Sequence, residues 1–338
     1  MCVTVNIALI GAGRIGKVHA KAIATAIPQA KIVAVADYFA AAAEELAEAY
    51  NIPFHTDNHL EAIQQPGVDA VLIASSTDTH APFIIDAAKA GKHIFCEKPI
   101  AADLAAIDEA LAAVDEAGVQ LQIGFNRRFD PTFARVKQAI DDGSIGTPHL
   151  LHIISRDPAP PPIEYVKVSG GIFFDMTIHD FDMARFLYGD VEEIYASGAV
   201  LVNPAIGEAG DIDTAIITLK FANGAMGTID NSRQAVYGYD QRVEAFGSKG
   251  SASSANHYAD AVTISDGQQV RRASLPLNFF LERYDASYKI ELQDFVNAIE
   301  NGTPVPVSGY DGRVPVVMAM AAKKSLDENR PVKLSEIG

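Results

Sequence analysis

The feature that most constrains the fold of this chain is a glycine-rich turn at residues 11–16, directly after a short apolar stretch. Residues 5–10 are almost continuously apolar, which is typical of a strand buried on both faces of a parallel sheet. Gly11, Gly13 and Gly16 follow, and an alanine-rich helix is predicted to run to about residue 27. Gly11 permits a tight turn, Gly13 lets a pyrophosphate approach the backbone, and Gly16 lets the helix pack closely on the strand. This order predicts a dinucleotide-binding unit, because a helix N-terminus then faces the phosphates.

An acidic residue, Asp37, ends the second predicted strand at residues 31–36. It lies near the distance of about 20 residues from the glycines that such units show. A carboxylate there accepts hydrogen bonds from both ribose hydroxyls and repels a 2′-phosphate. The sequence therefore favours NAD over NADP. The alternative, a glycine turn and an unrelated surface aspartate, requires all these parts to coincide by chance.

Strands and helices continue to alternate up to about residue 125. The predicted helices are residues 40–50, 58–64, one ending near 90, and 103–117, and the predicted strands are 69–74, 93–96 and 119–123. This alternation predicts an α/β domain with a doubly wound parallel sheet. Such sheets bind ligands at the carboxyl ends of their strands.

Polar residues follow two of these strands at the expected ligand edge. Ser75 and Ser76 come after the strand at 69–74, and His80 suits either a cofactor contact or helix capping and packing. Lys98 follows the next strand, where an ammonium can stabilise the alkoxide-like charge that builds as hydride leaves. The residue type of Lys98 alone favours a surface Lys-Pro turn. The sequence does not determine whether the Lys98–Pro99 peptide bond is cis or trans. The predicted cofactor-binding residues are Gly11, Gly13, Arg14, Ile15, Gly16, Asp37, Ser75, Ser76, His80, Glu97 and Lys98.

The pattern changes after residue 125 to long strands joined by tight turns. The dipeptides at 223–224 (Asn-Gly) and 266–267 (Asp-Gly) are hairpin signals. Predicted strands are 148–155, 194–200, 214–221, 225–229, 241–246 and two around 266–267, with helices at 131–140, 281–300 and 314–328. We therefore predict two domains, residues 1–125 and a mainly antiparallel α+β domain at 126–338. A sheet of this kind leaves one face uncovered, which an oligomer would bury.

Three polar residues, Asp175, His179 and Asp182, follow the glycines at 170–171. A continuous helix would place them at i, i+4 and i+7 on one face, with an imidazole between two carboxylates. This arrangement suits a general base, because a neighbouring carboxylate fixes the tautomer and favours the imidazolium. Taken alone, the trio is better explained as a solvated helix face.

The composition excludes several classes of partner. A formal net charge of −16 without a visible basic patch argues against nucleic acid. No apolar run approaches the roughly 20 residues of a membrane span, and residues 1–10 do not read as a signal peptide. Cys2 and Cys96 are the only cysteines, which predicts no disulfide framework and a cytoplasmic location. The histidines and cysteines form no ligand cluster in the sequence, so no metal is predicted.

Four motifs in order give the chain a resemblance to a known family: the glycines at 11–16, Glu-Lys-Pro at 97–99, Gly-Phe-Asn-Arg-Arg at 124–128, and Asp175-x-x-x-His179-Asp180. From end to end the chain resembles the Gfo/Idh/MocA family, and within it the inositol dehydrogenases. The resemblance implies a Rossmann domain, an open-faced C-terminal β-sheet domain, and a homotetramer assembled through those sheets.

The resemblance also implies a catalytic set and an activity. Lys98, Asp175 and His179 would be catalytic, and the residues around the substrate would be Lys98, Arg127, Asp157, Asp175, His179, Asp182 and Tyr239. The implied reaction is NAD-dependent oxidation of a secondary alcohol of a cyclic polyol such as myo-inositol. Ser155 and Asp157 stand where some inositol dehydrogenases carry histidine and asparagine, which leaves a related cyclitol or sugar open as substrate. A non-catalytic NAD(H)-binding sensor is disfavoured by the catalytic set.

Overall fold

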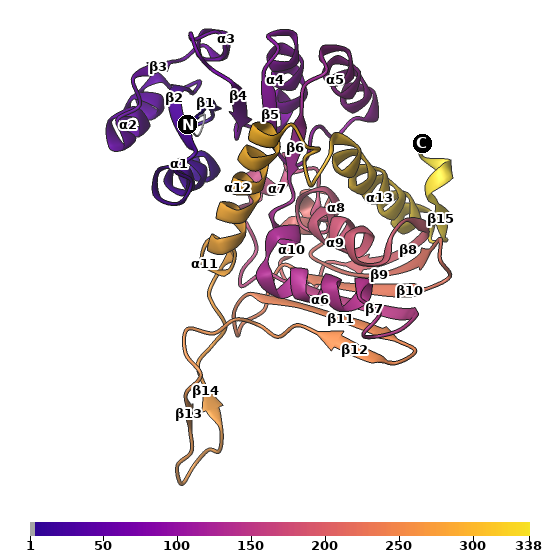
Figure 1. Cartoon of the computed structure of the whole chain (residues 1–338). Coiled ribbons are helices and arrows are strands. Elements are labelled where there is room, and N and C mark those ends of the chain that lie inside the picture. Colours follow the sequence, from indigo (N-terminus) through magenta and orange to yellow (C-terminus); the bar gives the residue numbers. More distant parts are fainter. Residues whose placement is uncertain (1–3) are drawn as a thin grey trace. The chain divides into compact units, whose positions relative to one another are not determined.

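The computed structural model describes residues 4–338, which form two compact units (Figure 1). The first unit comprises the chain up to Phe129 together with Ala286–Val316, and the second comprises Asp130–Asp285 together with Val317–Gly338. The sequence predicted one boundary at 125/126 and a single domain after it. The structure differs, because residues 286–316 return to the first unit.

The sheet of the first unit is parallel, with the strand order β3-β2-β1-β4-β5-β6. Its strands are β1 (Val5–Ile10), β2 (Ala30–Ala36), β3 (Phe54–Thr56), β4 (Ala70–Ile73), β5 (His93–Glu97) and β6 (Leu121–Gly124). The order reverses between β1 and β4, and ligands bind at such a switch point in doubly wound sheets. The predicted Rossmann sheet is confirmed, with β3 as a short edge strand that the sequence did not reveal.

The helices of this unit follow the predicted alternation. They are α1 (Arg14–Ala26), α2 (Ala40–Tyr50), α3 (His59–Ile63), α4 (Thr77–Lys89), α5 (Leu104–Ala117), α12 (Asp285–Asn301) and the 3₁₀ turn η1 (Asn126–Phe129). Asp103 caps α5 by accepting a hydrogen bond from the Ala106 amide. Leu292, Phe295 and Val296 of α12 join the buried core around β1, which explains why this late helix belongs to the first unit.

The second unit is built on a seven-stranded sheet with the order β12-β11-β7-β10-β9-β8-β15. The strands are β7 (Pro148–Arg156), β8 (Val191–Ala199), β9 (Thr214–Phe221), β10 (Met226–Ser232), β11 (Asp240–Gly247), β12 (Gly250–Ser253) and β15 (Val332–Lys333). Only the β7–β10 pair is parallel among the described strands of this sheet, so the mainly antiparallel prediction is confirmed. A separate two-stranded ribbon, β13 (Thr263–Ile264) and β14 (Arg272–Ala273), forms around the predicted Asp-Gly turn.

Helices of the second unit connect and cover these strands. They are α6 (Pro131–Asp141), α7 (Ile163–Val166), α8 (Ile172–Asp175), α9 (Ile178–Tyr188), α10 (Pro204–Glu208), α11 (Phe280–Arg283) and the 3₁₀ turn η2 (Leu334–Glu336). The long helix α13 (Gly309–Glu328) begins in the first unit and ends in the second. Within the part of the chain that is described, no helix is long and apolar enough to cross a membrane. Cys2 lies outside the described residues, and Cys96 is a buried free thiol.

The continuous helix that would place Asp175, His179 and Asp182 on one face does not form. Helix α8 ends at Asp175 and α9 begins at Ile178. At the interruption the Thr177 hydroxyl donates a 2.6 Å hydrogen bond to Asn231 Oδ1 on β10. A side-chain contact from a distant strand thus stabilises the break, and local helical spacing could not reveal it.

Candidate active site

The glycine loop of the first unit has the shape of a phosphate cradle. Gly11 has a φ of 104°, and a Cβ added there would lie 2.5 Å from the Ala74 carbonyl oxygen. A Cβ at Gly16 would lie 1.9 Å from the Gly11 carbonyl oxygen, so α1 packs directly on the turn. A Cβ at Gly13 would meet nothing within 4 Å. Two glycines are therefore needed for packing, whereas the third leaves open space at the N-terminus of α1 for a pyrophosphate.

Asp37 is held beside this loop. Its Oδ2 accepts a 2.7 Å hydrogen bond from the Ala12 amide, and its Oδ1 accepts one of 2.8 Å from the Phe39 amide. The carboxylate is thus fixed against the glycine loop, at the end of β2. A carboxylate fixed there has further lone pairs that suit ribose hydroxyls.

His80 connects the two strand ends predicted to line the ligand edge. It is buried, with Nδ1 2.8 Å from the Pro99 carbonyl oxygen and Nε2 3.2 Å from that of Ser75. Burial lowers the pKa of His80, while the two carbonyl acceptors oppose this shift. A neutral ring donates to only one carbonyl, and the shorter contact favours Pro99. His80 therefore packs between the Ser75 loop and the Lys98–Pro99 turn, and its direct contact with cofactor stays a prediction.

Lys98 lies at the carboxyl end of β5, and the Lys98–Pro99 peptide bond is cis. The sequence had left this isomer open. Arg127 lies in η1 after β6 and is buried. The neighbouring Arg128 pairs with Asp311 at 3.3 Å, which ties this turn to the start of α13. Lys98 and Arg127 are the predicted substrate-binding residues of the first unit. They thus follow adjacent strands, β5 and β6, at the carboxyl edge of the sheet.

Asp175, in the second unit, is held by two side chains that the sequence analysis did not single out. Tyr165 donates a 2.8 Å hydrogen bond to Oδ1, and Arg233 Nη1 lies 3.1 Å from Oδ2. The Arg233 side chain is only 1% exposed and also contacts Asp211 at 3.4 Å. An arginine just after β10 gives no sequence signal for this role, because its partners are 22 and 58 residues away. The carboxylate of Asp175 is therefore oriented by a buried cation.

His179 lies in the first turn of α9, which a buried amide anchors to the sheet. Asn231 Nδ2 donates a 2.8 Å hydrogen bond to Asp180 Oδ2, while its Oδ1 accepts from Thr177. His179 is half-buried, whereas Asp182 is fully buried. The amide of Asn231 thus fixes Thr177, in the α8–α9 break, and Asp180, in the first turn of α9.

The other predicted residues of this unit lie near the ends of its central strands. Asp157 follows β7, and its backbone amide donates to the Ser232 carbonyl at 2.9 Å. Tyr239 is 5% exposed and packs edge-on against Phe279 and Tyr284. The structure places Asp157 and Tyr239 on neighbouring strand ends, since β7 and β11 are paired.

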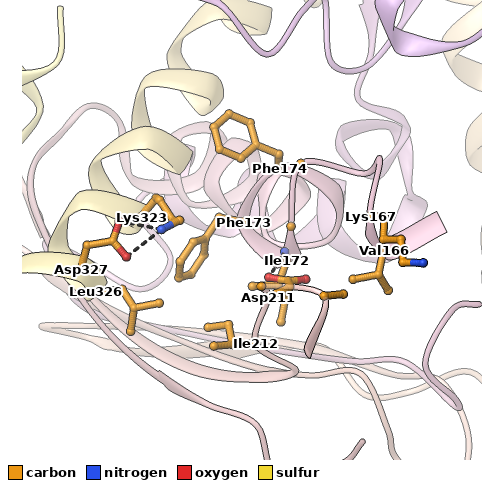
Figure 2. Close-up of a pocket in the computed structure, with 14 residues that line it drawn as sticks. Val166, Lys167, Ile172, Phe173, Phe174, Asp211, Ile212, Lys323, Leu326 and Asp327 are labelled. Carbon is orange, nitrogen blue, oxygen red and sulfur yellow. Dashed lines mark hydrogen bonds and ion pairs between the residues drawn. The ribbon is translucent and has the colours of Figure 1, made fainter. Parts of the chain in front are cut away.

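A pocket of about 330 Å³ lies beside α8 and the two glycines before it (Figure 2). Asp211 in its wall accepts a 3.1 Å hydrogen bond from the Ile172 amide and is the same carboxylate that contacts Arg233. Its lining is formed by Val166, Lys167, Gly170, Gly171, Ile172, Phe173, Phe174, Ala209, Gly210, Asp211, Ile212, Lys323, Leu326 and Asp327. This described lining includes none of the residues predicted to bind the polyol, so the pocket is not the predicted substrate site.

Comparison with known proteins adds family information to this geometry. The family model for the oxidoreductase family with an NAD-binding Rossmann fold matches residues 5–125, and the GFO/IDH/MocA C-terminal domain matches residues 133–253. The myo-inositol 2-dehydrogenase of Thermotoga maritima is 50% identical, over 98% of this chain and 99% of the relative.

Solved structures of inositol dehydrogenases are also similar. A myo-inositol dehydrogenase from Corynebacterium glutamicum shares 41% identity with a TM-score of 0.94, covering 98% of this chain and 99% of that one. The scyllo-inositol dehydrogenase from Lactobacillus casei, solved with NAD(H) and scyllo-inositol, shares 31% identity with a TM-score of 0.91, covering 98% and 99%. Because the two family models together match most of residues 5–253 and such relatives align almost end to end, the chain belongs to the Gfo/Idh/MocA family of oxidoreductases, with an NAD-binding Rossmann domain.

Proposed function

We propose that this protein oxidises a secondary alcohol of a cyclic polyol with NAD, converting myo-inositol to 2-keto-myo-inositol with release of NADH. One observation carries the proposal: Lys98, Asp175 and His179 occur in a chain that aligns over nearly its whole length with a relative named for this activity. The cradle at Gly13 and the fixed carboxylate of Asp37 fit the cofactor.

In the proposed mechanism, His179 accepts the proton of the reacting hydroxyl, and Lys98 donates a hydrogen bond to the same oxygen. Asp175 orients the imidazole and is itself oriented by Arg233. Arg127, Asp157, Asp182 and Tyr239 contact the remaining hydroxyls or the side chains that do so. Bound NAD supplies the capacity to accept hydride from the carbinol carbon. The protein contributes positioning and charge stabilisation, which account for most of the expected acceleration.

A second candidate is oxidation of a related ring, such as scyllo-inositol, a deoxy-inositol, levoglucosan or glucose. Similarity to the scyllo-inositol dehydrogenase favours this candidate. A hexose and a cyclitol present similar arrays of hydroxyls, so an acid–base set does not distinguish them. A sensor that binds NAD(H) without turnover needs no proton acceptor, and His179 argues against it.

The test incubates the protein with each of these polyols and either NAD or NADP. The formation of reduced cofactor is measured in each case. The highest kcat/KM with myo-inositol and NAD supports the proposal. A higher value with another ring selects the second candidate, and no reduced cofactor with any ring supports the sensor.

Replacement of Asp37 with alanine is expected to lower kcat/KM for NAD by about tenfold or more, because charged hydrogen bonds to the ribose are lost. The preference for NAD over NADP should narrow, since the carboxylate no longer repels a 2′-phosphate. Asp115→Ala, on the exposed surface of α5, is the matched control and should change neither value. An unchanged cofactor preference in the Asp37 variant would refute the ribose assignment.

We also propose that the protein is a cytoplasmic homotetramer assembled through the open face of the seven-stranded sheet. Ile216, Met226 and Phe246 are 49%, 54% and 43% exposed. Met226 and Phe246 both pair in register with Leu150 of β7, so these apolar side chains are neighbours on one face. An apolar patch across several strands supports burial against another copy. The buried free thiol of Cys96 supports the reducing compartment.

The double variant Ile216→Glu, Met226→Glu is expected to form smaller species in size-exclusion chromatography with light scattering, because it would bury carboxylates at the interface. Leu201→Glu, at a residue that is 74% exposed outside the strands, should leave the mass unchanged. If the double variant remains a tetramer, the assembly interface lies elsewhere. If the wild-type protein is a monomer, the proposed tetramer is excluded.

A further inference from the structure

A network of charged side chains crosses the open face of the seven-stranded sheet in the second unit. Arg156 of β7, Asp230 of β10 and Asp240 of β11 contribute to it from three adjacent strands. Arg156 lies six residues after Leu150, which pairs with the apolar patch of this face, and residues an even number apart in a strand share a face. The network therefore lies on the open face, and nothing in the mechanism proposed above uses it.

Arg156 holds two neighbouring side chains at once. Its Nε donates a 3.0 Å hydrogen bond to Asp230 Oδ1, and its Nη2 pairs with the other oxygen of the same carboxylate. Its Nη1 donates a 3.1 Å hydrogen bond to the hydroxyl of Tyr237. A guanidinium bound to a carboxylate through two nitrogens has a fixed plane, so its third nitrogen points to the phenol in one defined direction.

Tyr237 connects Arg156 to Asp240. Its hydroxyl donates a 2.6 Å hydrogen bond to Asp240 Oδ2. That carboxylate is buried and also accepts hydrogen bonds of 2.7 Å from Arg242 Nε and from Asn256 Nδ2. The phenolic oxygen thus accepts one hydrogen bond and donates another, between two partners that are themselves held. Removing this oxygen would break both contacts and leave the other ion pairs of Arg156 and Asp240 in place.

The network ties down the loop from β10 to β11, which passes the end of β7. The sheet order places β7 between those two strands. The Ala235 amide of this loop donates a 2.6 Å hydrogen bond to the carbonyl oxygen of Asp157, directly after β7. Tyr237 belongs to the same loop, and its bond to Arg156 is a second tie to the end of β7. One backbone contact and one side-chain contact therefore join the loop to two successive residues.

Two predicted polyol contacts are next to these ties. Asp157 directly follows Arg156, and Tyr239 follows Tyr237 by two residues. Gly238, between the two tyrosines, has a φ of 121°, a conformation that favours glycine. It lets Tyr237 reach the open face, while Tyr239 is 5% exposed and packs among aromatic rings of the interior. Movement of the loop on the open face would therefore move Tyr239 relative to Asp157.

We propose that the contact between Arg156 and Tyr237 is a clamp that positions Asp157 and Tyr239 for the polyol, so that Arg156 and Tyr237 are positioning residues. The proposal rests on the proposed function, in which Asp157 and Tyr239 serve the ring hydroxyls that do not react. Loss of the clamp should weaken substrate binding more than the chemical step, because the proposed proton acceptor, His179, is not part of the network. The usual net contribution of one hydrogen bond corresponds to about 2- to 10-fold in affinity.

The first test replaces Tyr237 with phenylalanine in the full-length protein, which removes only the bridging oxygen. KM for the polyol should rise about 3- to 10-fold, with kcat within about twofold of wild type and KM for NAD unchanged. Tyr195→Phe is the matched control, because the Tyr195 hydroxyl donates a 3.0 Å hydrogen bond to Asn329 from β8, three strands away from β7. This control should leave the polyol KM unchanged. A wild-type polyol KM in the Tyr237 variant, or an equal rise in both variants, would overturn the positioning role.

A double variant tests whether the two residues act through their shared contact. Arg156→Met should raise the polyol KM at least as much as Tyr237→Phe does, and the double variant should show little further increase, because the contact is already lost. Multiplied effects would mean two independent roles and contradict the clamp. Because both residues lie on the face proposed for assembly, light scattering should give every variant the mass of wild type. A smaller species with a raised KM would assign the effect to assembly instead.

Hydrogen exchange followed by mass spectrometry tests the clamp without turnover. The amides of residues 233–239 should exchange faster in Tyr237→Phe than in wild type, because the loop has lost one of its two ties. In Tyr195→Phe their exchange should be unchanged. Unaltered exchange in the Tyr237 variant would refute the clamp. If wild type oxidises no polyol, the proposed function fails and the expected change in KM fails with it, whereas the exchange rates still decide whether this contact holds the loop.

Discussion

Replacement of His179 with alanine is expected to lower kcat by about 10²–10⁴-fold, which is the usual contribution of a positioned general base. Binding of NAD should be nearly unchanged, because the cofactor residues belong to the first unit and His179 belongs to the second. The measurements are steady-state rates with the best polyol from the panel and titration of NAD binding by calorimetry. A large loss of kcat with intact cofactor binding would assign His179 to the chemical step.

A matched control separates this effect from the general loss of an imidazole. His55 on β3 is exposed, and His55→Ala should retain wild-type kcat. Full activity of the His179 variant would remove this residue from the mechanism and leave the proton acceptor to another group.

Replacement of Arg233 with methionine is expected to lower both stability and turnover. The substitution leaves Asp175 and Asp211 without the buried cation that they share, and breaking such a pair costs about 3–5 kcal/mol of unfolding free energy. Turnover should also fall, because Asp175 loses the contact that fixes one of its oxygens. Arg233→Lys should retain only part of the stability and of kcat, since an ammonium does not reproduce the contacts of a planar guanidinium with both Asp175 and Asp211. Urea unfolding and kcat measure the two effects.

A second substitution distinguishes the two consequences of losing Arg233. In the Arg233→Met background, Asp175→Asn removes one of the two carboxylate charges that Arg233 had balanced and should restore part of the stability, while kcat stays low because the carboxylate is still missing. If kcat returned together with stability, Arg233 would serve the fold alone and not the orientation of Asp175.

Much of the first unit followed from local sequence patterns. The apolar run before Gly11, the spacing of the glycines and Asp37 predicted the strand, the cradle and the cofactor, and family membership agrees with them. These features can be recognised in the sequence because a tight turn, a close helix approach and a ribose contact each require particular residue types within about 30 residues. The Asp103 cap of α5 was predictable for the same reason.

The arrangement around Asp175 was less accessible. Its residue types were recognised, but the continuous helix that would align them does not form, and Asn231 from β10 holds Thr177 and Asp180 at the start of α9. Arg233 was missed, and so was the return of α12 to the core of the first unit. Each of these contacts joins residues far apart in the chain, so no periodic pattern in the sequence predicts it.

The sequence by itself determined the classes of element, the dinucleotide unit and the identities of the candidate acid–base residues. Only the tertiary structure decided how those residues are oriented: Arg233 and Tyr165 hold Asp175, and the Lys98–Pro99 bond is cis. It also brought polar atoms of His19, Glu97 and Glu291, from three separate elements, within 4.8 Å of one another. The physical reason is that backbone propensity acts over neighbouring residues, whereas desolvation and charge pairing depend on which distant side chains the fold brings together.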